Sequence, residues 1–186
     1  PMLVSESGAS DGKFGEIIKN HGGETLVETK YDGFRIQIHK EGDISLFTRG
    51  LNPLNPNVFP ELFSQFATLP DGIYDGELAG TTGGIKGFNA VKKRVRKDLD
   101  PKLVDQFPLE IRYFDVLHIE DKSLINWPLY KRRQALEQCA SNISSQMTIE
   151  DPEELQEEYQ RTIGLGLEGL VCKDKASLYL PGGRTK

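Results

Sequence analysis

The sequence predicts an α+β fold in which antiparallel sheets are flanked by helices, and two observations carry this prediction. Residues 25–49 alternate apolar and polar side chains with the period of two that is typical of half-buried strands, and turn dipeptides interrupt the alternation. A small number of helical segments stands among further strand-like segments. This order favours an α+β domain over a doubly wound parallel sheet.

Residues 25–49 are interpreted as a three-stranded antiparallel meander. Asp32-Gly33 and Glu41-Gly42-Asp43 supply its two turns, because Asp-Gly is a strong hairpin signal. The apolar positions of the alternation are Leu26, Ile36, Ile38, Ile44 and Leu46.

The rest of the chain adds strands and helices. Strands are predicted at residues 72–79, 108–119 and 169–173, and a short helix at residues 60–66. Helices are predicted at residues 128–140 and from residue 152 onward. The second of these helices begins with an Asp151 N-cap and Pro152 at its first position. Its buried stripe is formed by Leu155, Tyr159 and Ile163.

Composition indicates one soluble intracellular domain. The 186 residues are 37% hydrophobic and 27% charged, and no apolar run approaches the length of a membrane-spanning helix. Cys139 and Cys172 lack the short paired spacings of zinc sites and disulfide scaffolds. No glycine-rich phosphate loop follows a strand, so any bound nucleotide must be held by side chains.

The net charge of −5 argues against binding nucleic acid through bulk electrostatics. Residues 86–97 form a local exception, with five basic residues close together: Lys92, Lys93, Arg94, Arg96 and Lys97. Phe88, Val91 and Val95 lie at helical spacing and would direct most of these cations outward. This segment is either a solvated helix face or a surface that contacts phosphates.

The segment Glu28-Thr29-Lys30-Tyr31-Asp32-Gly33-Phe34-Arg35 resembles the nucleophile motif of the covalent nucleotidyltransferases, which include DNA ligases, RNA ligases and mRNA capping enzymes. Taken alone, this segment would be better explained as a bare Asp-Gly hairpin with flanking solvated charges. Four further family motifs follow in order, as Thr48-Arg49-Gly50, Tyr74-Asp75-Gly76-Glu77-Leu78, Tyr113-Phe114-Asp115-Val116-Leu117 and Glu168-Gly169-Leu170-Val171-Cys172-Lys173. The set implies the covalent nucleotidyltransferase fold.

The fourth motif and the approach to the fifth at residues 179–184 most resemble ATP-dependent DNA ligases of the archaeal and eukaryotic type. Residues 1–186 are therefore expected to be an adenylation domain truncated within its fifth motif, with the DNA-binding and OB-fold domains absent. Such a fragment is expected to be monomeric and weakly active. The resemblance also implies nicked double-stranded DNA as partner of the parent enzyme, with no membrane partner, and leaves a sliding-clamp partner open.

In the family reaction a lysine amine attacks the α-phosphorus of ATP, and Lys30 matches that lysine. Because a free lysine is protonated at pH 7, its pKa must fall, and neighbouring cations such as Lys173 and Mg²⁺ are expected to lower it.

The resemblance also assigns binding roles. Glu28 is expected near the adenine amino group, Phe114 against the adenine face, and Lys173 and Arg184 at the phosphates. Arg35 and Arg49 match positions that contact the ribose or the 5′-phosphate of the nick. Glu77 is expected to hold the ribose hydroxyls or a metal, and Glu168 to bind Mg²⁺ or Mn²⁺.

Three functions remain open at this stage. The first is a DNA ligase that forms lysyl-AMP and passes AMP to the 5′-phosphate of a DNA nick, as in DNA replication, repair and recombination. The second is an RNA ligase or a capping-type nucleotidyltransferase. The third is a non-catalytic β-rich binding domain that retains the motifs without their chemistry.

Overall fold

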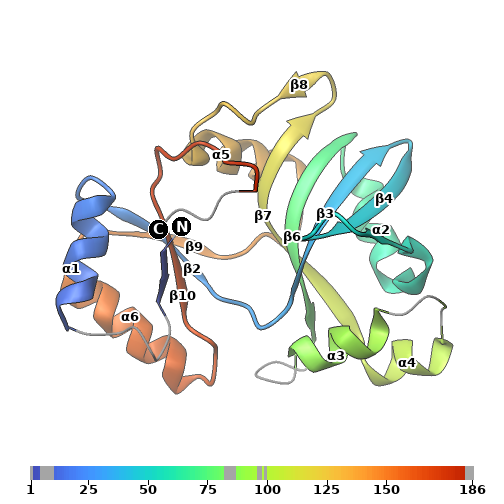
Figure 1. Ribbon diagram of the computed structural model, residues 1–186, viewed down its shortest axis with the longest axis horizontal. Coiled ribbons are helices and arrows are strands. Elements are labelled where there is room, and N and C mark those ends of the chain that lie inside the picture. The colour runs from blue at the N-terminus through green and yellow to red at the C-terminus, as the bar shows by residue number, and fades with distance from the viewer. Residues whose placement is uncertain (1, 5–10, 82–86, 96–97, 99, 183–186) are drawn as a thin grey trace.

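The computed structural model describes residues 2–4, 11–81, 87–95, 98 and 100–182, and places them around two antiparallel sheets (Figure 1). The smaller sheet has the strand order β1-β10-β2-β9, with bounds Met2–Val4, Leu170–Lys173, Thr25–Thr29 and Gln146–Ile149. The larger sheet has the order β5-β4-β3-β6-β7-β8, with bounds Pro53–Leu54, Asp43–Thr48, Phe34–Glu41, Gly72–Gly80, Leu109–Ile119 and Lys122–Ser123. The predicted α+β class with antiparallel sheets is confirmed.

The predicted meander over residues 25–49 is wrong in its first strand. β3 and β4 form the expected hairpin, but β2 belongs to the smaller sheet, where Thr29 faces Leu170 and Thr25 faces Ile149. Four consecutive residues of β2, 25–28, are buried, so β2 is covered on both faces and is not a half-buried hairpin strand. Residues 30–33, here called the connector, therefore carry the chain from one sheet to the other (Figure 1).

The larger sheet is built on β6 and β7, and the long strand predicted at residues 108–119 is confirmed. Its core contains Ile36, Leu78, Ile111 and Tyr113, all at most 1% exposed. Around it lie the short helices η2 (Pro56–Val58), η3 (Pro60–Leu62), α2 (Phe63–Thr68), α3 (Gly87–Arg94) and α4 (Pro101–Gln106), and α5 (Leu129–Cys139), which packs on β7.

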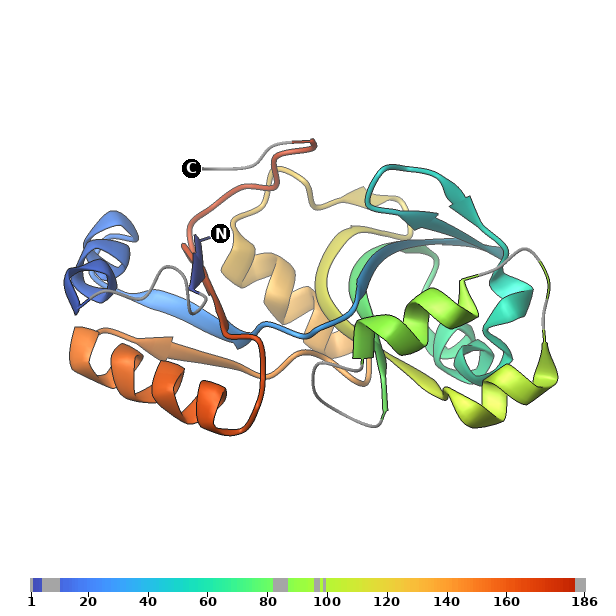
Figure 2. The same cartoon turned by 60° about the horizontal axis from the view of Figure 1, so that its bottom comes forward.

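The smaller sheet has a separate core beneath two helices. α1 (Asp11–Asn20) and α6 (Pro152–Gly164) pack together on the outer side of the sheet (Figures 1 and 2). Phe14 and Leu155 meet Val27 and Cys172 in this core. The side chain of Asp151 caps α6 through the amide of Glu153 at 2.8 Å, as predicted, whereas α1, β1 and β9 were not anticipated.

The basic helix α3 follows its prediction in part: Lys92 and Lys93 are exposed, as expected, but Arg94 and Phe88 differ. Arg94 does not face solvent: it is 3% exposed and donates to Glu61 at 2.7 and 3.0 Å. Phe88, predicted to be buried, is 40% exposed, while Val91 is fully buried. The helix therefore turns one of its cations inward as a structural anchor. Lys86, Arg96 and Lys97 lie outside the described residues.

The last described segment, residues 174–182, runs back along α5. The amides of Leu129 and Tyr130 donate to the carbonyls of Ser177 and Lys175 at 2.9 and 3.1 Å. Across the described parts of the chain, no helix combines the length and the apolar character that crossing a membrane would require.

Candidate active site

The connector places Lys30 at the junction of the two sheets. The Lys30 amide donates to the carbonyl of Gly169 at 2.8 Å, directly before β10, and the Lys30 ammonium pairs with the carboxylate of Glu168. This lysine therefore lies against the fourth motif, although Glu168 follows Lys30 by 138 residues in the sequence (168 − 30).

Close backbone approaches hold the connector in place. A Cβ on Gly33 would lie 2.5 Å from the carbonyl oxygen of Leu78 in β6, so only glycine fits there without a shift. A Cβ on Gly87 would meet the carbonyl oxygen of Asp32 at the same distance. Asp32 and Gly33 were predicted to form a hairpin turn, but they instead seat the connector, and with it Lys30, against β6 and α3.

Burial lowers the pKa of Lys30, and the nearby carboxylates of Glu77 and Asp32 oppose this change. The expected fall in pKa agrees in direction, but Lys173 is not its cause. The Lys173 ammonium pairs with Glu28, and desolvation of Lys30 itself is the main cause.

Glu77 lies on β6 opposite Arg35 of β3 and Arg112 of β7. Burial raises its pKa to about 7, although the charges of Lys30, Arg35 and Arg49 lower it. Such a carboxyl group changes its charge close to neutral pH.

Glu77, Asp32 and Glu168 thus surround one lysine with three acidic groups. Among the described residues, no group of three or more His, Cys, Asp or Glu side chains is arranged to hold a metal ion by itself.

Arg35 is held by two residues to which the sequence assigned no role. Its Nη2 donates to Asp75 at 2.6 Å and to the hydroxyl of Tyr179 at 3.0 Å, and its guanidinium lies 5.7 Å from the centre of the Phe114 ring. Burial raises the pKa of Asp75, and the charge of Arg35 opposes the rise. Tyr179 thereby joins the segment 174–182 to the middle of the larger sheet.

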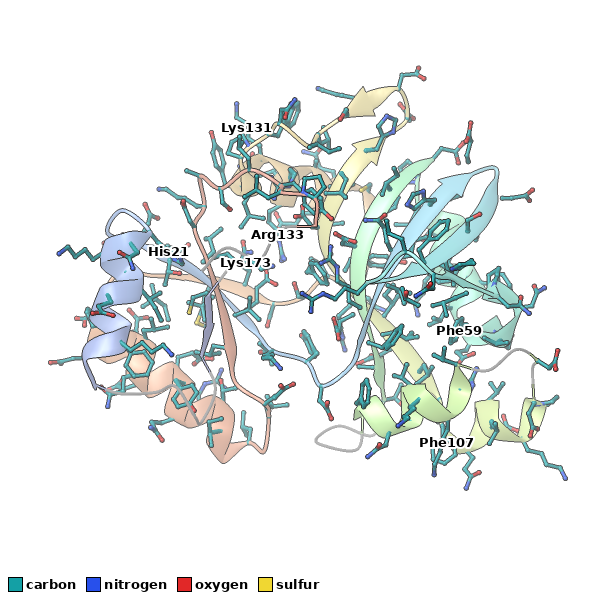
Figure 3. The ribbon with its side chains drawn as sticks, viewed as in Figure 1. His21, Phe59, Phe107, Lys131, Arg133 and Lys173 are labelled. Carbon is teal, nitrogen blue, oxygen red and sulfur yellow. The ribbon has the colours of Figure 1, made fainter. Side chains whose placement is uncertain are left out.

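Glu28 is the centre of a second, more enclosed cluster. It is 4% exposed, and its Oε2 accepts from Lys173 Nζ at 2.7 Å and from Ser144 Oγ at 3.2 Å. Its Oε1 accepts from Gln146 Nε2 at 2.7 Å. Lys173 also stands 5.1 Å from the centre of the Phe114 ring, so its side chain reaches from β10 to the larger sheet (Figure 3).

Eight of the nine predicted site residues are described, and seven of them fall into these contacts: Lys30, Glu28, Arg35, Glu77, Phe114, Glu168 and Lys173. Arg49 is exposed at the end of β4 and acts on Glu77 through its charge. Arg184 lies outside the described residues. Glu168, predicted for metal binding, is the ion-pair partner of Lys30.

Ser144, Gln146 and Tyr179 were missed, although Tyr179 stood in a quoted motif. Ser144 and Gln146 carry no motif. Only the pairing of β9 with β2, which sets Gln146 opposite Glu28, reveals them.

Comparisons with known proteins agree with this geometry. Residues 1–186 match the protein family described as ATP dependent DNA ligase domain. A DNA ligase from Thermococcus fumicolans is 34% identical over 198 residues, in a match that covers 100% of this chain and 34% of that protein. The chain thus spans about a third of the length of this relative.

Solved structures share the fold at lower identity. A mycobacterial DNA ligase D complexed with ATP and MES superposes with a TM-score of 0.66 and 20% identity, covering 88% of this chain and 52% of that one. An archaeal ATP-dependent RNA ligase gives a TM-score of 0.58 and 20% identity, covering 88% and 43%. The predicted nucleotidyltransferase fold is confirmed, and it is common to ligases of both nucleic acids.

Proposed function

The chain belongs to the ATP-dependent DNA ligase domain family, and from this membership we propose that it performs the nucleotide-loading step of a DNA ligase. The neutral amine of Lys30 attacks the α-phosphorus of ATP. A P–N bond forms, the bond from the α-phosphorus to the oxygen bridging to the β-phosphorus breaks, and pyrophosphate leaves. The parent enzyme then transfers AMP from Lys30 to the 5′-phosphate of a DNA nick.

The environment of Lys30 is the observation that carries this proposal. An ammonium cannot attack phosphorus, so Lys30 must first lose a proton. Its burial makes this loss easier, and the carboxylates of Glu168 and Glu77 stand beside it as proton acceptors. A surface lysine of a binding module would need neither the burial nor the acidic neighbours.

The same carboxylates fit a divalent cation. Three acidic groups lie around Lys30, and a triphosphate would bring further negative charge beside them. Mg²⁺, or Mn²⁺ in its place, needs only one or two carboxylates when substrate phosphates complete its coordination. Glu77 and Glu168 would hold it, and the ion would neutralise charge that develops on the phosphates.

The remaining polar residues suit the two ends of ATP. Glu28 and Phe114 would take the adenine, through its amino group and its ring face. Lys173 now contacts both of them, so a bound base would displace its ammonium toward the phosphates, where Arg184 would add positive charge. Arg35 and Arg49 would contact the ribose or the 5′-phosphate of the nick.

DNA is proposed as the nucleic acid because the family and the relative from Thermococcus fumicolans carry that name. The fold alone does not select it, since an archaeal RNA ligase shares the fold. Joining of nicked duplex DNA is proposed for the whole intracellular protein, because this chain spans only about a third of the length of the relative from Thermococcus fumicolans. A sliding-clamp partner would likewise belong to that whole protein.

Labelling with ATP tests the proposal. Incubation with ATP labelled at the α-phosphate and Mg²⁺ should give an acid-labile protein adduct that is absent from Lys30→Ala. Lys19→Ala, which removes an exposed lysine of α1, should label like the wild type. Equal labelling of Lys30→Ala would refute the assignment. Two comparisons with the full-length protein separate a DNA ligase from the alternative nucleotidyltransferases. The first measures whether GTP competes with ATP for adduct formation, and the second compares the sealing of nicked DNA with that of nicked RNA.

A further inference from the structure

We propose that Gln146 and Ser144 are positioning residues that hold the Glu28 carboxylate in the orientation needed to recognise the 6-amino group of the purine. The inference rests on the proposed function and extends it to base specificity. Neither residue belongs to any of the sequence motifs, and both act through Glu28 rather than on the reacting atoms.

The first support is the path of residues 142–146, which join the two sheets. At one end, the amide of Tyr113 in β7 donates to the carbonyl of Asn142 at 3.0 Å, and the amide of Ser144 donates to the carbonyl of Tyr113 at 2.8 Å. At the other end, Gln146 opens β9 and faces Glu28 across the ladder with β2. The segment therefore sets the position of Glu28 relative to the larger sheet, which carries Phe114.

The second support is the direction of the Ser144 hydroxyl. Arg133 on α5 donates from Nη1 to Ser144 Oγ at 3.3 Å and from Nη2 to the Ser144 carbonyl at 2.8 Å. Because an arginine only donates, Ser144 Oγ accepts from it and keeps its own hydrogen for Glu28 Oε2 at 3.2 Å. Ser144 is 1% exposed, which leaves little room for water to replace these contacts.

The third support is a count of hydrogen-bond acceptor positions. An ionised carboxylate offers about four lone-pair directions, and three on Glu28 are taken by Lys173, Ser144 and Gln146. When the Lys173 ammonium leaves for the phosphates, the amide and the hydroxyl remain. They hold a carboxylate whose free lone pairs accept from a 6-amino group and repel a 6-oxo group. ATP would thus be preferred over GTP.

The test compares ATP with purine riboside 5′-triphosphate, which has hydrogen in place of the 6-amino group. The rate of formation of the Lys30 adduct is measured against the concentration of each nucleotide, and the efficiencies are expressed as a ratio. The wild type should favour ATP by about tenfold or more, the range of a hydrogen bond to a charged group. Gln146→Leu should reduce the efficiency with ATP by about tenfold and change that with the analogue by less than about twofold. Ser144→Ala should lower the ratio by about threefold.

The ratio does not depend on the fraction of each protein that is folded, because both nucleotides are measured on one sample. Gln160→Leu, an exposed glutamine of α6, is the matched control and should keep the wild-type ratio. A wild-type ratio retained in Gln146→Leu and Ser144→Ala, or no preference in the wild type, overturns the positioning role alone. Absence of any adduct from the wild type with ATP removes the proposed function and this inference together.

Discussion

Two ion pairs of the molecule, one behind the larger sheet and one at the edge of the smaller sheet, differ in how deeply they are buried. Arg132 on α5 and Asp115 on β7 of the larger sheet form a pair whose side chains are 3% and 10% exposed, with two hydrogen bonds of 2.8 and 2.9 Å between them. At the edge of the smaller sheet, the side chains of Lys30 and Glu168 are 22% and 43% exposed. The first pair is sealed within the protein, while the second is open to exchange with a substrate.

This difference divides the molecule into a scaffold and a reactive edge. Arg132 also donates to the carbonyls of Trp127 and Ser177, and thus ties α5 to the segment 174–182. A guanidinium that makes four hydrogen bonds to three protein residues has little capacity left for a ligand. Lys30 and Lys173, by contrast, are each held by an ion pair that the proposed triphosphate would replace.

The largest effect is expected from breaking the sealed pair. Arg132→Met leaves the carboxylate of Asp115 buried without its cation, and should lower the free energy of unfolding by about 3–5 kcal/mol. Urea denaturation measures the loss. Arg161→Met, which removes an exposed arginine paired with Glu158, should leave the urea midpoint unchanged. If the two variants unfold alike, the pair of Arg132 and Asp115 is not the scaffold described above.

The sequence predicts those parts of the fold that depend on neighbouring residues better than those that depend on residues distant in the chain. β7 was predicted because its alternation of buried and exposed positions is contained in its own residues. β2 was placed in the wrong sheet because its partners, β9 and β10, lie more than a hundred residues away, and Asp32-Gly33 looks like a hairpin turn. Period and turn chemistry describe a strand, but not which strand it pairs with.

The candidate site shows the same limit. Resemblance to a family supplied Lys30, Glu77 and Glu168, and the structure brings these residues together. It could not supply Gln146 or Ser144, because their contacts with Glu28 exist only once β9 lies beside β2. The inward turn of Arg94 was hidden for a related reason, since its partner Glu61 comes from a separate helix.

An intermediate effect is expected at the connector, where scaffold and reactive edge meet. Gly33→Ala places a methyl group 2.5 Å from the carbonyl oxygen of Leu78, so the backbone must move. The cost should be about 1–3 kcal/mol of stability, and adduct formation at Lys30 should fall with it. Gly164→Ala is the control, because nothing lies within 4 Å of its added carbon. Unchanged urea unfolding and unchanged labelling would show that the connector does not need this close contact.

The smallest effect concerns Glu77, where function and stability oppose each other. Its pKa is about 7 in the folded protein against an ordinary value of 4.5, so the folded state binds a proton that the unfolded chain has lost. Stability should therefore fall as pH rises from about 4.5 to about 7, and stay lower above that range. Glu77→Gln has no carboxyl group to ionise.

The melting temperature of Glu77→Gln should thus exceed that of the wild type at pH 8 and match it more closely at pH 5. A gain of about 2–4 °C corresponds to roughly 1 kcal/mol in a chain of this size. Labelling of Lys30 by ATP should fall in the same variant, because a neutral amide neither accepts a proton nor binds a metal ion well. Glu157→Gln, at an exposed position of α6, should change neither measurement. If the variant were less stable than the wild type at pH 8, the charged Glu77 carboxylate would stabilise the fold. Burial of this carboxylate at the reactive edge would then not lower the stability of the protein.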